Sequence, residues 1–277
     1  MKVLEKRILV EKDGIRIILI RLFAPDIAAK AKPGQFVVVM ATEKSERVPL
    51  TVVDHDQDSV TLIFQELGYS TALLGMMDMG AALYALTGPL GHPTEIKRYG
   101  TVILVGGGVG IAEIYPVAKA LKAKGNKVIS ILGSRTKDLL ILEEEMAEVS
   151  EVHVCTDDGS KGREGFTTDI LRELLTRDEG RGTRGDLVYT VGPIPMMKKV
   201  AEATKERGVK TMASLNALMV DGTGMCGCCR VTIGKEVKFT CIDGPEFDAH
   251  QVDWGELQKR NCVYEDKERH ICNLSED

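Results

Sequence analysis

The sequence predicts an α+β protein of two domains, with an antiparallel β-barrel followed by a doubly wound parallel α/β domain and a short cysteine-rich segment. Three observations lead to this prediction. Short alternating apolar runs separated by turn residues fill the N-terminal third, strand and helix patterns alternate after it, and six of the seven cysteines lie at position 226 or beyond. We expect the three parts to cover residues 1–97, 98–213 and 214–277.

The N-terminal part has the pattern of short antiparallel strands. Lys6–Glu11 and Ile15–Arg21 flank the dipeptide Asp13-Gly14, which is typical of a tight hairpin turn. Helical signal is weak here apart from Ser70–Met77. Six short strands at this spacing indicate a small β-barrel. The remaining four strands are expected at Gln35–Ala41, Leu50–Asp54, Ser59–Gln65 and Ala82–Thr87.

Alternation of strands and helices then predicts a parallel sheet with helices on both faces. The strands are expected at Thr101–Val105, Lys127–Leu132, Val152–Thr156 and Leu187–Val191. The helices are expected at Ala112–Lys124, Leu139–Val149, Thr168–Leu175 and Pro195–Arg207. We expect a polar loop at Asp178–Arg184, and little periodic structure in the polar chain after Pro245.

A glycine-rich stretch, Gly106–Ala112, lies between a buried strand and a helix, where backbone N–H groups and the helix dipole bind phosphate. It departs from the G-x-G-x-x-G pattern because Ile111 stands where the third glycine is expected. A turn without a ligand is the alternative. Turns after two later strands end at the same sheet edge, where ligands of open α/β sheets bind. The predicted nucleotide-binding residues are Gly107, Gly108, Val109, Gly110, Asp157, Asp158, Gly192 and Pro193.

The sharpest signal is the spacing of one aspartate and three cysteines near the C-terminus. Asp221-x4-Cys226-x2-Cys229, followed by Cys241, matches the plant-type [2Fe–2S] spacing with a carboxylate replacing the first thiolate. Cys228 falls between ligands, and the glycines of the loop let it curl around one centre. A zinc site with the same four ligands and a cluster of reactive cysteines are the alternatives, but zinc sites usually contain two close cysteine pairs and only one is present here. We therefore predict a [2Fe–2S] cluster on Asp221, Cys226, Cys229 and Cys241.

Composition narrows the function classes. The chain is 44% hydrophobic and 28% charged with a net charge of −5, as in ordinary globular proteins, so nothing indicates a nucleic-acid or membrane partner. The N-terminus is interrupted by charges, and we expect a cytoplasmic location. An odd number of cysteines then favours cluster ligation over disulfides. Cys262 and Cys272 lie in a polar segment without a motif.

In this order, the segments resemble the ferredoxin-reductase-like electron-transfer subunits, which combine a flavin barrel, a pyridine-nucleotide domain and a C-terminal [2Fe–2S] loop. The resemblance covers essentially the whole chain. The segment 47–51 is similar to the family's flavin-binding strand, although its arginine stands one position early, which on a strand would exchange faces. The resemblance implies that FAD is bound by Arg47, Pro49, Leu50, Thr51, Ile63, Phe64, Gln65, Gly68, Ser70 and Thr71.

Within this family, Asp221 and the run Leu215–Gly227 resemble the small subunits of NADH-dependent ferredoxin:NADP oxidoreductases, which bifurcate electrons. Sulfide dehydrogenase small subunits look nearly the same, and the electron-transfer subunits of dihydroorotate dehydrogenase differ by having four cysteines in the loop. The resemblance implies that the chain binds FAD, NAD(H) and one [2Fe–2S] cluster. It also implies a larger flavin/[4Fe–4S] partner subunit that binds NADP(H), with ferredoxin reached through the complex.

The residues alone do not select the nucleotide. Ser134-Arg135 stand where an acidic residue for the NAD ribose is expected, and they suit a 2′-phosphate as well, so NAD(H) is implied by the resemblance only. No acid–base dyad is visible, and none is needed when a cofactor carries the chemistry. The alternative from another class is a redox sensor with a zinc-binding tail.

Overall fold

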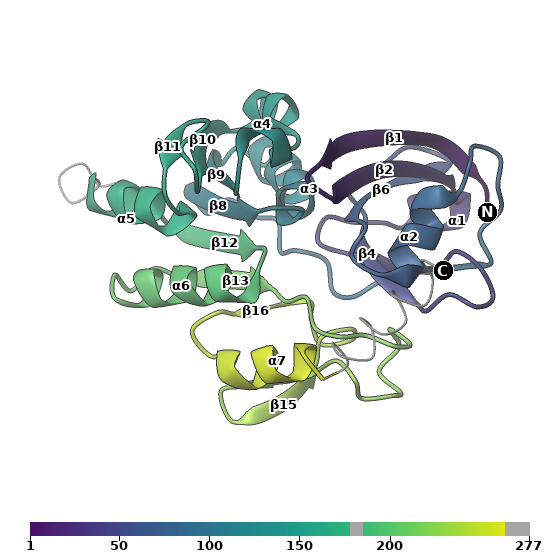
Figure 1. The fold of residues 1–277 in the computed structure, drawn as a ribbon. Helices are drawn as coiled ribbons and strands as arrows, with labels where there is room; N and C mark the ends of the chain where they lie inside the picture. Colours follow the sequence, from purple (N-terminus) through teal and green to yellow (C-terminus); the bar gives the residue numbers. More distant parts are fainter. Residues whose placement is uncertain (178–184, 264–277) are drawn as a thin grey trace. The chain divides into compact units, whose positions relative to one another are not determined.

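The computed structural model describes residues 1–177 and 185–263 of the chain and divides them into two compact units. Unit 1 comprises Met1–Pro93, Ala217–Pro245 and the residues from Asp253 onward, and unit 2 comprises Thr94–Asn216 and Glu246–Val252. Figure 1 shows the fold, coloured by position in the sequence. None of the helices in these two ranges is long and apolar enough to cross a membrane.

The N-terminal part of unit 1 is built from two antiparallel sheets around one apolar core. The sheets have the strand orders β1-β2-β6-β5 and β4-β3-β7, and the core takes side chains from both, among them Ile20 and Val37. This confirms the predicted antiparallel N-terminal domain. The strands are β1 (Val3–Lys12), β2 (Ile15–Phe23), β3 (Phe36–Met40), β4 (Val48–Thr51), β5 (Asp54–His55), β6 (Ser59–Gln65) and β7 (Ala85–Leu90), and the helices are α1 (Pro25–Ala28) and α2 (Tyr69–Met76).

The predicted hairpin between β1 and β2 is confirmed. Lys12 pairs with Ile15, and both turn residues, Asp13 and Gly14, have positive φ angles of 51° and 75°. Only glycine and short polar residues adopt this conformation at low cost. The turn therefore follows from local sequence chemistry alone.

The strand predicted at Leu50–Asp54 is divided in the structure because the chain passes from one sheet to the other. The Val52 N–H group bonds to the Gln35 carbonyl beside β3 (3.0 Å), whereas the Val53 N–H group bonds to Thr61 of β6 (2.9 Å). Strand β7 also begins three residues later than expected, and α1 was not predicted. These differences depend on tertiary pairing, which alternation of apolar residues does not reveal.

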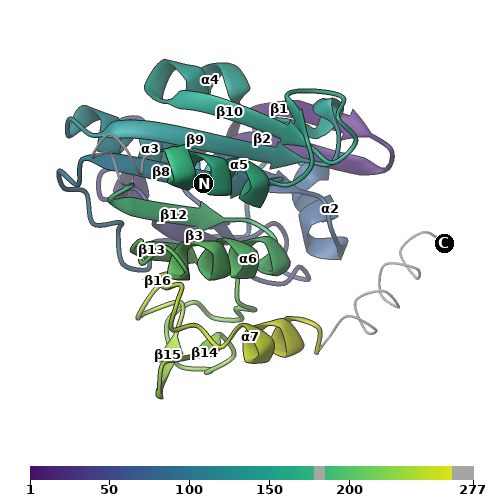
Figure 2. The same ribbon diagram turned by 90° about the vertical axis from the view of Figure 1, so that its left-hand side faces the viewer.

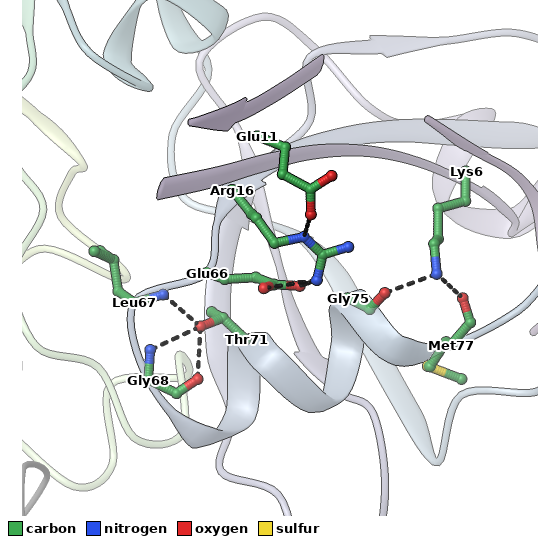
Figure 3. A network of polar contacts seen from close by, with 9 residues as sticks. All are labelled: Lys6, Glu11, Arg16, Glu66, Leu67, Gly68, Thr71, Gly75 and Met77. Atoms are coloured by element: carbon green, nitrogen blue, oxygen red, sulfur yellow. Dashed lines mark hydrogen bonds and ion pairs between the residues drawn. The ribbon is translucent and has the colours of Figure 1, made fainter. Parts of the chain in front are cut away.

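Helix α2 is held at both ends by side chains (Figure 3). At its start, the Thr71 hydroxyl accepts the N–H groups of Leu67 (2.9 Å) and Gly68 (3.1 Å). At its end, the Lys6 ammonium donates to the carbonyls of Gly75 (2.8 Å) and Met77 (3.1 Å). A cation at a helix C-terminus also interacts favourably with the helix dipole. The position of α2 against β1 is therefore fixed by polar contacts as well as by the core.

Unit 2 contains a seven-stranded sheet in the order β11-β10-β9-β8-β12-β13-β16, in which only the β13–β16 pair is antiparallel. Helices α3 and α4 pack together on one face, and α5 and α6 on the other (Figures 1 and 2). The predicted doubly wound domain is confirmed. Its elements are β8 (Thr101–Gly107), α3 (Gly110–Ala123), β9 (Lys127–Ser134), a 3₁₀ helix (Lys137–Leu139), α4 (Glu143–Val149), β10 (Glu151–Thr156), β11 (Arg163–Glu164), α5 (Thr167–Arg177), β12 (Leu187–Val191), α6 (Ile194–Lys205), β13 (Thr211–Ser214) and β16 (Glu246–Asp248).

The helix predicted at Leu139–Val149 is wrong for its first four residues. Leu142 has a φ of 54°, a left-handed conformation that no residue adopts within an α-helix, so α4 starts only at Glu143. Strands β11, β13 and β16 were not predicted, because each is four residues or shorter. The polar loop expected at 178–184 lies outside the described residues.

The C-terminal segment is more ordered than its polar composition suggested. It contains the hairpin of β14 (Arg230–Ile233) and β15 (Glu236–Phe239), followed by helix α7 (Trp254–Asn261). Asp253 caps α7 by accepting the Glu256 N–H group (2.9 Å), and Leu257 is completely buried. The expectation of little periodic structure after Pro245 is therefore wrong.

The compact units differ from the boundaries expected at 97 and 213. Residues 94–97 belong to unit 2, where Asn126 holds the Lys97 carbonyl (2.9 Å) and Thr94 bonds to Glu246. Residues 246–252 also belong to unit 2, because β16 pairs with β13. Residues 214–216 belong to unit 2 as well. The rest of the described C-terminal segment is part of unit 1 and does not form a compact unit of its own.

We predict that Gly75 is required because Glu66 covers it. A Cβ atom on Gly75 would lie 1.8 Å from Glu66 Oε1, so Gly75→Ala must displace the carboxylate from Arg16, to which it bonds at 3.0 Å. We expect a loss of about 1–2 kcal/mol in the free energy of unfolding, measured by thermal unfolding. In a Glu66→Ala background the loss should be smaller, because only the contact with Ile18 Cδ1 (2.8 Å) remains and alanine favours helix by about 1 kcal/mol. Equal losses in both backgrounds would contradict this explanation.

Candidate cofactor-binding sites

The predicted nucleotide residues meet at the centre of the unit 2 sheet. Strand β8 pairs with β9 on one side and with β12 on the other, so the direction of chain progression reverses between β8 and β12. The turn that contains Gly108 follows β8, and the turn that contains Gly192 follows β12. Ligands of open α/β sheets bind at such a switch point.

Glycines allow a close approach of the two turns. A Cβ atom on Gly110 would lie 2.5 Å from the Val191 carbonyl oxygen, so the start of α3 can reach β12 only without a side chain. Gly192 has a φ of 153°, and a Cβ atom on it would lie 3.1 Å from the backbone nitrogen and oxygen of Gly107. Gly108, with a φ of 58°, instead has no atom near its Cβ position. The first two glycines are explained by packing, and Gly108 leaves space where a ligand can approach the backbone.

The start of α3 has the chemistry for an anionic ligand. The Gly108 N–H group donates to the Gly133 carbonyl (2.9 Å). The first N–H groups that donate to carbonyls at the helix start are those of Ile111, to Gly108, and Ala112, to Val109. This leaves the N–H groups of Val109 and Gly110 at the helix start, where the dipole is positive. These groups fit the phosphates of a dinucleotide.

The two predicted aspartates differ in their availability. The Asp158 carboxylate accepts both the hydroxyl (2.6 Å) and the N–H group (3.0 Å) of Ser160, and these bonds hold its pKa below the usual value. Asp158 therefore closes its own turn, whereas Asp157 is exposed at the end of β10. Pro193 supplies the first carbonyl of α6, which accepts the Met196 N–H group (2.9 Å).

The residues that bear on nucleotide choice lie at the end of β9. The Ser134 hydroxyl donates to the Thr136 carbonyl (2.7 Å), so it is engaged within its own turn. Arg135 is exposed. A 2′-phosphate bound here would pair with the Arg135 cation. Neither Ser134 nor Arg135 carries a carboxylate that could accept the ribose hydroxyl groups of NAD.

A second anion-binding arrangement lies at the start of α2 in unit 1. The Ser70 hydroxyl accepts the Glu46 N–H group (2.8 Å) and so brings the segment before β4 to the helix start. Arg47 follows directly, is exposed, and lies before β4, which begins at Val48. The exchange of strand faces therefore does not apply to Arg47. One cation and the first N–H groups of α2 fit a diphosphate.

The other predicted flavin residues lie on β4 and β6. Pro49, Leu50 and Thr51 are half-buried in β4, the edge strand that pairs with β3. Phe64 is buried in the core of unit 1, so it supports the sheet from inside. Ile63 and Gln65 point to the opposite face, because side chains alternate along a strand. Thr71 fixes the helix start through its hydroxyl, as described above.

The predicted cluster ligands form two pairs, both in unit 1. The sulfur atoms of Cys229 and Cys241 are buried and lie 3.2 Å apart. Asp221 is joined to Cys226 through the Cys226 N–H group, which donates to Asp221 Oδ2 (2.8 Å). Three of the loop glycines, at 222, 224 and 227, have positive φ angles between 68° and 84°. The donors fit an iron–sulfur cluster in type and number, with two donors for each iron.

The two pairs are not joined into one metal site by their side chains. In the part of the chain that the structure describes, no group of three or more His, Cys, Asp and Glu residues is arranged to hold a metal ion. Burial, and then the neighbouring Cys229 thiol, raise the pKa of Cys241 to about 12, while an N–H bond from Gly224 acts in the opposite direction. Cys228 is half-exposed, Cys262 is exposed, and Cys272 lies outside the described residues.

Sequence reasoning missed several polar residues around these sites. Arg230 and Arg260 donate to backbone carbonyls of the ligand loop, which we define as residues 221–229. In unit 2, partial burial raises the pKa of Glu246 to about 7, and its carboxyl accepts bonds from Thr94 and from the Tyr189 hydroxyl (2.8 Å). Arg260 lies in a helix that was not predicted, and Arg230 directly follows Cys229 but is not a metal-ligand type, so the ligand spacing indicated neither.

Two family models match the chain. A model of the iron–sulfur cluster binding domain of dihydroorotate dehydrogenase B matches residues 216–253, which contain all four predicted ligands. A model of the oxidoreductase NAD-binding domain matches residues 104–202, which contain both glycine turns.

Full-length comparisons agree with these models. The chain is 46% identical over 250 residues to the "Dihydroorotate dehydrogenase B (NAD(+)), electron transfer subunit homolog" of Thermotoga maritima, covering 90% of this chain and 87% of that protein. It is 39% identical to the corresponding subunit of Bacillus caldolyticus, covering 80% and 86%. A solved structure of NADH-dependent reduced ferredoxin-NADP oxidoreductase, studied for flavin-based electron bifurcation, has a similar chain with a TM-score of 0.91, 40% identity and coverage of 100% and 98%. The ferredoxin reductase in carbazole 1,9a-dioxygenase shares the fold, with a TM-score of 0.62, 21% identity and coverage of 75% and 65%.

We expect Arg47 to contribute to FAD binding through a phosphate. Arg47→Ala should weaken FAD binding about 10- to 100-fold, since a charge-assisted hydrogen bond contributes about 1.5–3 kcal/mol. The measurement is flavin retention on dialysis in mild chaotrope, with iron content determined in parallel. Lys44→Ala is the matched control, because Lys44 is an exposed cation of the same loop. Equal flavin retention in the two variants would count against this role.

Proposed function

The chain belongs to the family of electron transfer subunits that includes those of dihydroorotate dehydrogenase B, and we propose that it transfers electrons between NAD(H), FAD and a [2Fe–2S] cluster within a larger complex. When bound, the flavin exchanges the two electrons of a hydride for the single electrons that a cluster accepts. The alternative of a zinc-binding redox sensor is set aside, because the model matching the ligand loop describes an iron–sulfur domain.

The role of the protein in this reaction is placement. In unit 2, the glycine turns and the start of α3 hold the dinucleotide phosphates. In unit 1, Arg47 and the start of α2 hold the flavin diphosphate, and Pro49–Thr51 with Ile63 and Gln65 border the flavin. Asp221, Cys226, Cys229 and Cys241 hold the cluster. No side chain of these sets is assigned a proton-transfer role.

For the complex itself, we propose an NADH-dependent reduced ferredoxin:NADP oxidoreductase, with a larger flavin/[4Fe–4S] subunit that binds NADP(H). The observation that carries this proposal is the similarity to a chain of that enzyme over the full length of both chains. Asp221 supports it, because the loop has a carboxylate where four-cysteine loops have a thiolate. The second candidate is a dihydroorotate dehydrogenase complex, which the name of the Thermotoga maritima relative favours.

The native complex distinguishes these candidates. Purified anaerobically and identified by subunit mass, it should show flavin bleaching with both NADH and NADPH but none with dihydroorotate. The isolated chain should be reduced faster by NADH than by NADPH at equal concentration. Bleaching by dihydroorotate would establish the second candidate. Faster reduction of the isolated chain by NADPH, abolished by Arg135→Ala, would show that Arg135 binds a 2′-phosphate.

We predict that the cluster depends on three cysteines and not on Cys228. Serine at Cys226, Cys229 or Cys241 should remove or severely destabilise the cluster, because a hydroxyl is a poorer iron ligand than a thiolate. Cys228→Ser is the matched control and should retain about two iron atoms per chain, measured by iron analysis and electron paramagnetic resonance.

Substitutions of Asp221 test whether its carboxylate is a cluster ligand. Asp221→Cys should keep the cluster with an altered spectrum and potential, because it restores an all-thiolate loop. If Asp221→Ala leaves the resonance signal and the potential unchanged, the carboxylate is not a ligand, and Cys228 becomes the first candidate for the fourth position.

A further inference from the structure

Two arginines hold consecutive carbonyl groups of the ligand loop. Arg260 Nη2 in helix α7 donates to the Cys228 carbonyl oxygen at 2.9 Å. Arg230 Nη1, at the start of β14, donates to the Gly227 carbonyl oxygen at 3.2 Å. Both peptide groups lie between Cys226 and Cys229, which are predicted ligands. The orientation of these two peptide groups is therefore constrained by the arginine side chains.

Helix α7 is well placed to hold a fixed position for Arg260. Glu256 accepts the Thr232 N–H group of β14 (3.1 Å), and Asn261 accepts the Leu218 N–H group before the loop (3.3 Å). Leu257 is completely buried. The helix thus contacts the chain before, within and after the ligand loop, although it lies beyond the matched iron–sulfur domain, which ends at residue 253.

Because the peptide bond is planar, a contact that fixes a carbonyl group also fixes the direction of the N–H group in the same peptide. In a trans peptide, the C=O and the following N–H point in opposite directions. Holding the Cys228 carbonyl toward Arg260 therefore directs the Cys229 N–H group away from Arg260. Holding the Gly227 carbonyl toward Arg230 likewise directs the Cys228 N–H group away from Arg230.

We propose that Arg260 and Arg230 are positioning residues for the [2Fe–2S] cluster, because they turn the N–H groups of Cys229 and Cys228 toward it and so set its reduction potential. This inference rests on the proposed function, since it requires the cluster. Hydrogen bonds to the sulfurs and nearby positive charge stabilise the reduced cluster, which carries one more negative charge. Both arginines therefore raise the potential.

The test is a redox titration of the full-length, cluster-loaded chain, followed by electron paramagnetic resonance. In Arg260→Gln, the ratio of reduced to oxidised cluster at a fixed potential should fall about tenfold, which equals a shift of about 59 mV to more negative potential for one electron. Arg260→Lys keeps the charge and a donor, so it should shift less. Arg230→Gln should shift the potential in the same direction. Lys259→Gln is the matched control, because it removes one exposed cation from the same helix.

Each outcome decides the inference. An unchanged potential in Arg260→Gln with full iron content would overturn it, as would an equal shift in Lys259→Gln, which would indicate only the loss of overall charge. If Arg260→Gln binds no iron, Arg260→Lys decides: iron binding with a potential near that of the parent supports the inference. Absence of iron in Arg260→Lys, with an unfolding temperature like that of the parent, overturns it. A parent chain without a cluster signal would instead refute the proposed function.

Discussion

Every candidate site in this chain depends on backbone N–H groups that the fold orients so that an anionic ligand can reach them. The starts of α2 and α3 each present such groups, because the first turn of a helix cannot bond them within the helix. Diphosphates and cluster sulfurs are anionic, and oriented N–H groups bind them without adding a full charge. The fold therefore has to fix peptide orientation in three places. It does so with glycines beside β8 and β12, with Ser70 and Thr71 at α2, and with arginines at the ligand loop.

The sequence predicted those elements whose chemistry is local. The Asp13-Gly14 hairpin and the βα alternation of unit 2 follow from turn residues and apolar runs, and both are confirmed. The helix break at Leu142 was not predictable, because nothing in the residue type favours its positive φ angle. The division of the strand near Val52 depends on which sheet offers a free carbonyl. The helix break and the strand division depend on tertiary pairing, which cannot be inferred from a single sequence.

The same distinction applies to the sites. Spacing was sufficient to select the loop from Asp221 to Cys229, and the structure brings Cys229 into contact with Cys241 across twelve positions. Spacing gave no indication of Arg260, because its helix lies in a segment that composition described only as polar. A signal for that helix was present: Asp253 as an N-cap residue, followed by Trp254 and Leu257, which share a face. Supporting residues around a site are thus found only when the elements that carry them are found.

Asp221 shows how the loop is ordered by its own carboxylate. A carboxylate and a thiolate carry the same charge, so the proposed ligand Asp221 matches the charge of the cysteine found in four-cysteine loops. The difference lies in hydrogen bonding: Asp221 accepts the N–H groups of Thr223 (2.7 Å) and Cys226 (2.8 Å), and the Thr223 bond is the main cause that lowers its pKa. A thiolate is a weaker acceptor and has one atom in place of two. Residues 221–226 are therefore closed into a turn by the aspartate, which reduces the conformational entropy lost when a cluster is bound.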